Sequence, residues 1–343
     1  MTDAHFILSK KIVINQIKVL NNLGFQISYS YKTNHEVGNI LQKICPDVNF
    51  SIHTPEEIKM IKDKSKISFF TQAESENELK DILKKGVRKF VIDNEIDLER
   101  ILKEIKGTST KIDLSLRMKF QEHRIGTGKY FVYGMNSNKI NKIISSIKNN
   151  SLIQKLGIHL HRKSQNTSEW EIIEEIKDSL SEETLKRINF INLGGGLPVE
   201  YRNYPLENQK YIFKKLSETI NFLKKYNIKT IIEPGRFIAA PATKLITEII
   251  QLSDKNIILN TTIYNCALDT IIGQHKMLVE NELATGEDYL IKGNSPTRDD
   301  IFRYRVKLKN PKVGNKITFL NAGAYNYTTD FFVYKKLKTI IID

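Results

Sequence analysis

Three consecutive glycines, Gly194, Gly195 and Gly196, lie within the segment INLGGGLP at residues 191–198. Glycine loses more conformational freedom on folding than any other residue, so such a run indicates a place where side chains would obstruct something. One interpretation is a loop whose backbone N–H groups approach an anion such as a phosphate. The other is a loose turn, and the glycines alone do not decide between the two.

Six residues with reactive or charged side chains lie at the ends of predicted strands. They are Lys32, Arg117, His159, His161, Glu233 and Arg236. Each has an ordinary explanation, because a strand-end lysine is usually solvated and a strand histidine usually packs in a core. As a set they match the needs of pyridoxal phosphate (PLP). Its aldehyde takes a lysine amine as a Schiff base, its phosphate takes backbone donors and a cation, and its pyridine nitrogen takes a carboxylate.

The elements that would position these side chains alternate between strands and helices. Amphipathic segments such as ESENELKDILKKG, with Leu79, Ile82 and Leu83 on one face, predict the helices. Eight strand–helix units in series predict an α/β fold, a closed (β/α)8 TIM barrel of which one mouth collects the strand ends. An open doubly wound sheet is the alternative. The eight predicted strands are 25–31, 48–52, 66–70, 89–93, 111–118, 152–161, 187–194 and 228–235.

The pattern changes after residue 237, where short strand-like runs are separated by Gly, Asn and Asp. These runs are KLITEIIQL, NIILNTTIYN, DYLIKG, YRVKLK and KITFLNAGAY. They predict a C-terminal antiparallel β domain, which the strand-like segment 5–14 is expected to join. We therefore expect a PLP-binding barrel over residues 24–237 and a β domain formed by residues 1–23 and 238–343.

The chain has 343 residues and a net charge of +14, from 53 Lys and Arg against 39 Asp and Glu. The basic residues are scattered over predicted helices, so a solvated lysine surface is a better interpretation than nucleic-acid binding. No apolar run has membrane-spanning length, and the first residues lack the layout of a signal peptide, so we expect a cytoplasmic protein. With only Cys45 and Cys266, we expect neither a disulfide framework nor a metal site.

Five motifs in chain order resemble those of the PLP-dependent decarboxylases with an alanine-racemase-type barrel. This family includes ornithine, diaminopimelate and carboxynorspermidine decarboxylases. The motifs are SYSYKTN, GIHLHRKSQ, LGGGLP, EPGRFIAAPA and NAGAYNY, and they extend over nearly the whole chain. The resemblance implies that the glycines cradle the cofactor's phosphate. It also implies a homodimer, because the family's active sites are shared between subunits.

The resemblance assigns a role to each matched residue. Lys32 would carry the Schiff base, His161 would stack on the cofactor ring, and Glu233 would contact the pyridine nitrogen. A glutamate there favours decarboxylation, since racemases of this fold place an arginine at that point. The other residues implied to bind the cofactor are Arg117, Ser164, Gly194, Gly195, Gly196, Gly235, Arg236 and Tyr325.

The sequence departs from the family in the segment that completes the partner's site. The corresponding stretch is KGNSPTRDD at 292–300, with Pro296 where the family has a cysteine and Thr297 where an acid is often found. A second family aspartate, which grips the distal amine in ornithine decarboxylases, would fall near Cys266. The two anionic contacts for a diamine tail are therefore expected to be missing.

A pocket that lacks those carboxylates and gains Arg298 should prefer an anionic substrate tail, because an unpaired buried charge is unfavourable. We expect Arg298, Lys292 and Asp300 to bind the substrate. Diamino acids bearing a citryl group fit this pocket, as in the N-citrylornithine decarboxylases of siderophore (rhizoferrin) biosynthesis. The alternatives are ornithine, lysine, diaminopimelate or carboxynorspermidine as substrate, and a non-catalytic regulatory homologue. Segment 123–135 offers further cations in His123, Arg124 and Lys129.

Overall fold

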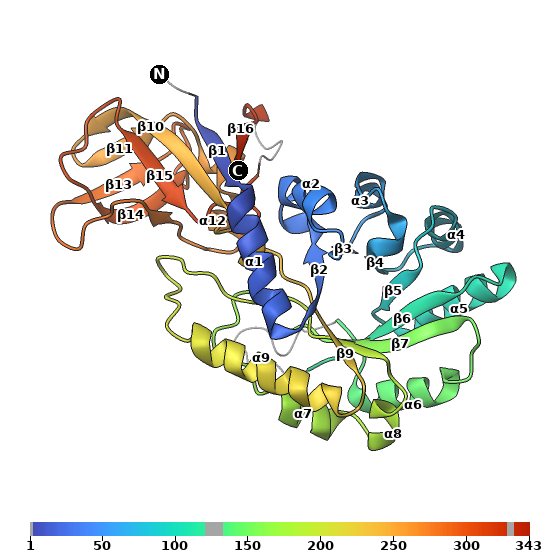
Figure 1. Ribbon diagram of the computed structural model, residues 1–343. Helices are drawn as coiled ribbons and strands as arrows, with labels where there is room; N and C mark the ends of the chain where they lie inside the picture. Colours follow the sequence, from blue (N-terminus) through green and yellow to red (C-terminus); the bar gives the residue numbers. More distant parts are fainter. Residues whose placement is uncertain (1–2, 121–132, 328–332) are drawn as a thin grey trace. The chain divides into compact units, whose positions relative to one another are not determined.

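Figure 1 shows the computed structural model, which describes residues 3–120, 133–327 and 333–343. The chain divides into two compact units, which we call the barrel unit and the β unit. The barrel unit comprises Ile17–Leu197 and Asn208–Gly235. The β unit comprises Met1–Gln16, Pro198–Glu207 and Arg236–Asp343. The limits expected from the sequence for the two domains stay a prediction.

Eight parallel strands close the barrel unit, which confirms the predicted (β/α)8 architecture (Figure 1). Each strand pairs with the next, and the last pairs with the first through Gln26 opposite Ile231. All eight predicted strand segments contain one of these strands. They are β2 (Gln26–Ser30), β3 (Asn49–Ile52), β4 (Ile67–Phe70), β5 (Lys89–Ile92), β6 (Ile112–Arg117), β7 (Ile153–His159), β8 (Phe190–Asn192) and β9 (Lys229–Ile232).

Helices with well-formed N-termini connect the barrel strands. The predicted helix at 74–86 is α4, where Ser75 and Glu78 form a capping box and the predicted apolar face is buried. Asn34 caps the helix that follows the short 3₁₀ turn Tyr31–Thr33. The helices are α2 (His35–Ile44), α3 (Pro55–Met60), α4 (Glu76–Lys84), α5 (Glu95–Thr108), α6 (Ser137–Ile147), α7 (Ile172–Ser179), α8 (Glu182–Leu185) and α9 (Gln209–Lys224).

Small polar side chains occupy buried positions on several barrel strands. Ser28, Ser51, Ser115 and Asn192 are each at most 3% exposed. Ser28 Oγ and Ser51 Oγ are 2.9 Å apart, within hydrogen-bonding distance. Barrels of this kind usually fill their interior with layers of Val, Ile and Leu. In this barrel, Ser51 and Asn192 instead form hydrogen bonds to Glu233 at the carboxyl ends of the strands.

The β unit contains a mainly antiparallel sheet, as predicted, with strand order β12-β15-β10-β11-β13-β14. Phe6, Leu245, Ile257 and Phe319 belong to its core. The strands are β1 (His5–Ser9), β10 (Thr243–Ser253), β11 (Asn256–Leu259), β12 (Leu278–Val279), β13 (Asp288–Lys292), β14 (Ile301–Lys307), β15 (Lys316–Leu320) and β16 (Lys338–Ile342). Its short helices are α10 (Arg236–Ala239), α11 (Ile263–Cys266) and α12 (Leu268–Ile272).

The predicted strand at 5–14 is only half correct. Residues 5–9 form β1, which pairs with β10 and β16 and so joins the β unit as expected. From Lys10 the chain is helical, because α1 (Lys10–Leu23) buries Val13, Ile17 and Leu20 along one face. Their spacing of four and three residues is helical, and it prevailed over the β-branched composition. Among the described helices, none has the length and apolarity needed to cross a membrane.

Candidate active site

The barrel unit builds a buried carboxylate centre around Glu233, the residue after β9. Glu233 Oε1 accepts hydrogen bonds from Ser51 Oγ (2.6 Å) and Asn192 Nδ2 (2.9 Å). Its Oε2 lies 3.1 Å from His159 Nε2. Burial alone would raise the pKa of Glu233, but His159 and the two hydrogen bonds lower it to about 2. The side chain is therefore a fixed negative charge at neutral pH, as its predicted role at a pyridine nitrogen requires.

Two imidazoles, the half-buried His53 and the buried His159, flank Phe70 at this end of the barrel. The Phe70 ring stacks on His53 with centroids 4.7 Å apart and meets His159 edge-on at 5.1 Å. Among the described residues, neither His53 Nδ1 nor His159 Nδ1 has a hydrogen-bond partner. Burial, helped by Lys32, lowers the pKa of His53 to about 4. His53 is therefore neutral at pH 7, with a polar nitrogen available to a bound group.

Lys32 lies in the 3₁₀ turn directly after β2 and keeps solvent-exposed surface. Enough protein surrounds its amine that desolvation lowers its pKa, an effect that Arg117 reinforces and Glu233 opposes. The Arg117 guanidinium, at the end of β6, pairs with Asp93 at 3.4 Å and lies over the Tyr133 ring. A lysine with a lowered pKa holds more of the neutral amine, which is the nucleophilic form.

The glycine run is packed tightly against neighbouring backbone, which rules out the loose turn. Gly194 and Gly196 have φ of +68° and +103°, where other residues are strained. A Cβ on Gly194 would overlap Leu160 O, and one on Gly195 would lie 2.8 Å from Glu233 O. The chain therefore runs beside the Glu233 backbone, whose N–H donates to Gly194 O at 2.8 Å.

His161 and Ser164, which the resemblance assigns to ring stacking and phosphate binding, lie on the loop after β7. Gly195 N–H donates to His161 Nδ1 at 3.3 Å, so the neutral ring carries its proton on Nε2. Burial is the main reason that the pKa of His161 falls to about 3. The ring is thus uncharged at neutral pH, as suits stacking against an aromatic face. Ser164 is an exposed residue of the same loop.

Gly235 brings two of the sequence motifs together. A Cβ at this position would overlap Thr33 Oγ1, the residue after Lys32. The Ser30 N–H also donates to Pro234 O at 3.4 Å. The segments that carry Lys32 and Glu233 are therefore neighbours within the barrel unit, and a side chain at Gly235 would force them apart.

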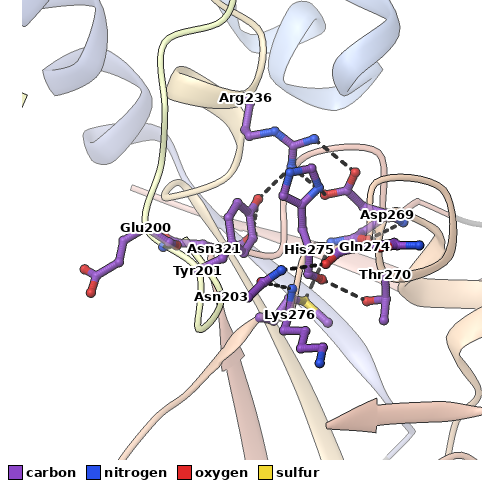
Figure 2. Close-up of polar contacts among 12 residues, drawn as sticks. Glu200, Tyr201, Asn203, Arg236, Asp269, Thr270, Gln274, His275, Lys276 and Asn321 are labelled. Carbon is purple, nitrogen blue, oxygen red and sulfur yellow. Dashed lines mark hydrogen bonds and ion pairs between the residues drawn. The ribbon is translucent and has the colours of Figure 1, made fainter. Parts of the chain in front are cut away.

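Arg236 begins the β unit and is engaged by an acidic partner that we did not predict (Figure 2). Its guanidinium binds both carboxylate oxygens of Asp269 and donates to Tyr201 Oη at 2.9 Å. His275 Nδ1 lies 3.0 Å from Asp269 Oδ2, the oxygen that Arg236 Nη1 also contacts. Burial would raise the pKa of Asp269, but His275 and Arg236 lower it. Tyr325 adds a ring 5.3 Å from the guanidinium, so the two predicted phosphate ligands Arg236 and Tyr325 are neighbours.

Asp269 lies in the segment where the family's second aspartate was expected to be missing. It follows Cys266 by three residues and is only 4% exposed. Because it is paired with the Arg236 guanidinium and lies 3.0 Å from His275 Nδ1, it is engaged inside the β unit, and the expectation that a diamine tail lacks this contact stays a prediction.

The 292–300 segment folds around Asp300. Asp300 is fully buried, and its carboxylate accepts the backbone N–H groups of Ile263 (2.9 Å) and Ser295 (3.0 Å). It therefore shapes the loop, and its expected role in substrate binding stays a prediction. Arg298 projects outward, with a side chain 97% exposed and 3.6 Å from Asp299, and Lys292 is half-buried at the end of β13.

The predicted extra cations His123, Arg124 and Lys129 lie outside the described residues. Ser51, Asn192 and His53 were not predicted as site residues, although all three lie on β3 or β8 or next to their ends. The sequence marks them only by alternation, because each lies next to an apolar residue that points to the other face of its strand.

Comparison with known proteins identifies the family. The family model for the pyridoxal-dependent decarboxylase, pyridoxal binding domain, matches residues 10–240. A diaminopimelate decarboxylase from Vibrio cholerae is 27% identical over 249 residues, 65% of this chain and 57% of the relative. A carboxynorspermidine/carboxyspermidine decarboxylase from Campylobacter jejuni is 25% identical over 187 residues, 49% of this chain and 47% of the relative.

The chain thus spans about half the length of these curated relatives. Among solved structures, diaminopimelate decarboxylase from Helicobacter pylori complexed with L-lysine superposes with a TM-score of 0.84 at 18% identity. It covers 100% of this chain and 92% of its own. At this level of identity the superposition supports the fold only. The family match, in contrast, extends over most of the chain and supports membership of the family. The protein belongs to the pyridoxal-dependent decarboxylases and carries their pyridoxal binding domain.

Proposed function

We propose that the protein is a PLP-dependent decarboxylase that removes the α-carboxylate of an L-amino acid. The observation that carries this proposal is the ionised carboxylate of Glu233, held by three side chains beside the glycine loop. The tight glycine cradle and the unpartnered imidazole nitrogens nearby are features that a bound cofactor would use. The residues present therefore fit PLP.

Each of these residues has a task toward the cofactor. When bound, PLP supplies an electron sink for the pair released as the Cα–carboxylate bond breaks. Glu233 holds a proton at the pyridine nitrogen, because its own pKa is far too low to take that proton away. Lys32 provides the amine, and His161 provides a neutral ring face. The Gly196 N–H is the backbone donor that we assign to the phosphate. The roles of Gly194, Gly195, Arg236 and Tyr325 in phosphate binding stay predictions from the resemblance.

We further propose that the substrate has an anionic distal group, as N-citrylornithine does. The two buried carboxylates of the β unit nearest the expected contacts for an ammonium tail already have other partners. Asp269 is paired with Arg236 and His275, and Asp300 is taken up by backbone N–H groups. Arg298, in contrast, extends its guanidinium into solvent from a loop that Asp300 holds in shape.

Arg298→Ala is expected to lower kcat/KM for the citryl-bearing substrate by at least about tenfold, because a charge pair with the tail is lost. Activity on free ornithine or lysine should stay nearly unchanged. Asp299→Asn, which alters the neighbouring and equally exposed side chain, is the matched control. A CO₂-release screen over N-citrylornithine, ornithine, lysine, diaminopimelate and carboxynorspermidine provides the measurement.

The opposite pattern would select the alternative substrates. If free ornithine or lysine is the best substrate and Asp299→Asn lowers its kcat/KM, the loop binds an ammonium tail through the Asp299 carboxylate. A wild type that binds PLP on Lys32 but releases CO₂ from none of the five would instead support the regulatory homologue.

We also propose a homodimer in which residues 292–300 and Tyr325 complete the partner's site. Lys32→Ala and a variant with Pro296, Thr297 and Arg298 replaced by glycine should each be inactive alone. After mixing and subunit exchange, about half the dimers carry one change on each chain and have one intact site of two. Activity should then recover to about a quarter of the wild-type value. Native mass spectrometry would verify the exchange, and exchange without recovery would contradict shared sites.

A further inference from the structure

The amino-terminal end of the barrel holds a cavity that the proposed reaction does not use. Its volume is about 260 Å³, well beyond what a single water needs. Several of its lining residues begin strands, as Asn49 begins β3, Lys89 begins β5 and Lys229 begins β9. Because Glu233 follows the other end of β9, the lysines of this cavity lie toward the opposite end of the barrel, whereas Asn192 lines the cavity and also donates to Glu233 Oε1.

The charges of the cavity lining are unbalanced. Three lysines, Lys89, Lys155 and Lys229, line it together with one carboxylate, Asp113. Lys155 lies 3.8 Å from Asp113, and Lys89 donates instead to the neutral Asn49 at 2.8 Å. Burial lowers the pKa of Lys89, with Asp113 opposing the shift. Cationic groups that outnumber the carboxylates around a cavity favour the arrival of an anion.

Neutral donors complete the lining. Ser115 is 3% exposed, and its Oγ has no hydrogen-bond partner among the described residues. Asn189 Oδ1 accepts the Leu156 N–H at 2.9 Å, which fixes the amide and leaves its NH₂ group as the donor. Both residues line the cavity. Ammonium groups, a hydroxyl and an amide NH₂ are the donors that carboxylate and phosphate oxygens take.

We propose that this cavity is a second ligand site, which binds a small oxyanion such as inorganic phosphate or a short dicarboxylate. The excess of two positive charges selects an anion over a neutral ligand. The unpartnered Ser115 hydroxyl lies where it would donate to one of the ligand oxygens. Its lysines are distinct from the cofactor-binding residues, although Asn192 belongs both to the cavity lining and to the Glu233 centre. Binding of the anion does not require decarboxylation.

Isothermal titration calorimetry of the full chain, loaded with saturating PLP to fill the cofactor cradle, tests the proposal. Inorganic phosphate and succinate are titrated separately at constant ionic strength set with KCl. We expect one saturable site per chain, with a Kd of about 1 mM or tighter for the preferred anion. The preference between phosphate and succinate distinguishes the two sources of oxyanion.

Variants locate the binding in the cavity. Lys155→Met combined with Lys229→Met should weaken binding by at least about tenfold, and Ser115→Ala by about tenfold, since charged hydrogen bonds are lost. Lys84→Met, which removes an exposed lysine from α4, is the control for net charge and should bind normally. Absence of saturable binding, or binding that the paired lysine variant retains, would show a hydrated cavity only and overturn the proposal.

Discussion

Glu233→Ala is expected to lower decarboxylation by about 10²–10³-fold or more while the protein still binds PLP. The carboxylate is 8% exposed and anchored by Ser51, Asn192 and His159, so its charge is fixed before any ligand arrives. Without it, a proton on the pyridine nitrogen loses its partner and the ring becomes a weak electron sink. Steady-state CO₂ release and cofactor absorbance, measured on the same samples, separate turnover from binding.

Glu104→Gln provides the matched control, since Glu104 is a buried carboxylate of the same unit on α5. It should keep wild-type turnover, and a Glu233→Ala enzyme with unchanged kcat would refute the assigned role.

The contribution of Glu233 to the stability of the folded protein depends on pH with a defined sign. Because folding lowers the pKa of Glu233 from 4.5 to about 2, its stabilising contribution is complete above pH 4.5. That contribution is lost as the pH falls toward 2.

Lys32→Ala is expected to remove the covalently held cofactor and lower turnover by about a thousandfold or more, because the nucleophilic amine is lost. Lys32→Arg should be equally impaired, since a guanidinium keeps the positive charge and cannot form the bond. Absorbance of the purified protein in the visible range measures the bound cofactor.

Lys89→Arg is the control for loss of a lysine. Lys89 belongs to the same barrel, and burial lowers its pKa as well, but it lies at the amino-terminal end. Its variant should remain yellow and active. A Lys32→Ala protein that keeps both colour and turnover would place the amine on another residue.

The barrel was predictable because its strands are short runs of β-branched and aromatic residues between amphipathic helices. A strand buried on both faces shows no alternation of apolar and polar residues, so only its composition indicates a strand. The helix α1 was misread for the same reason, since KKIVIN has strand-like composition and only the burial of Val13, Ile17 and Leu20 reveals its period. Composition and periodicity conflicted there, and packing decided the outcome.

The site was predictable where a motif fixes chemistry locally, as around Lys32, the glycine run and Glu233. The hydrogen-bond partners of Glu233 were not, because Ser51 and Asn192 precede it by 182 and 41 residues and look like ordinary strand positions. The inward turn of Asp300 depends on a contact with the distant Ile263 N–H. Local sequence carries no record of such pairings until the chain is folded.

The most direct test of this account is the chemical identity of the residue that holds the cofactor. The PLP-loaded full chain is reduced with borohydride, digested and mapped by mass spectrometry. The account predicts one pyridoxyl group per chain, on Lys32. An adduct on any other lysine, or no adduct in a protein that decarboxylates its substrate, would contradict it.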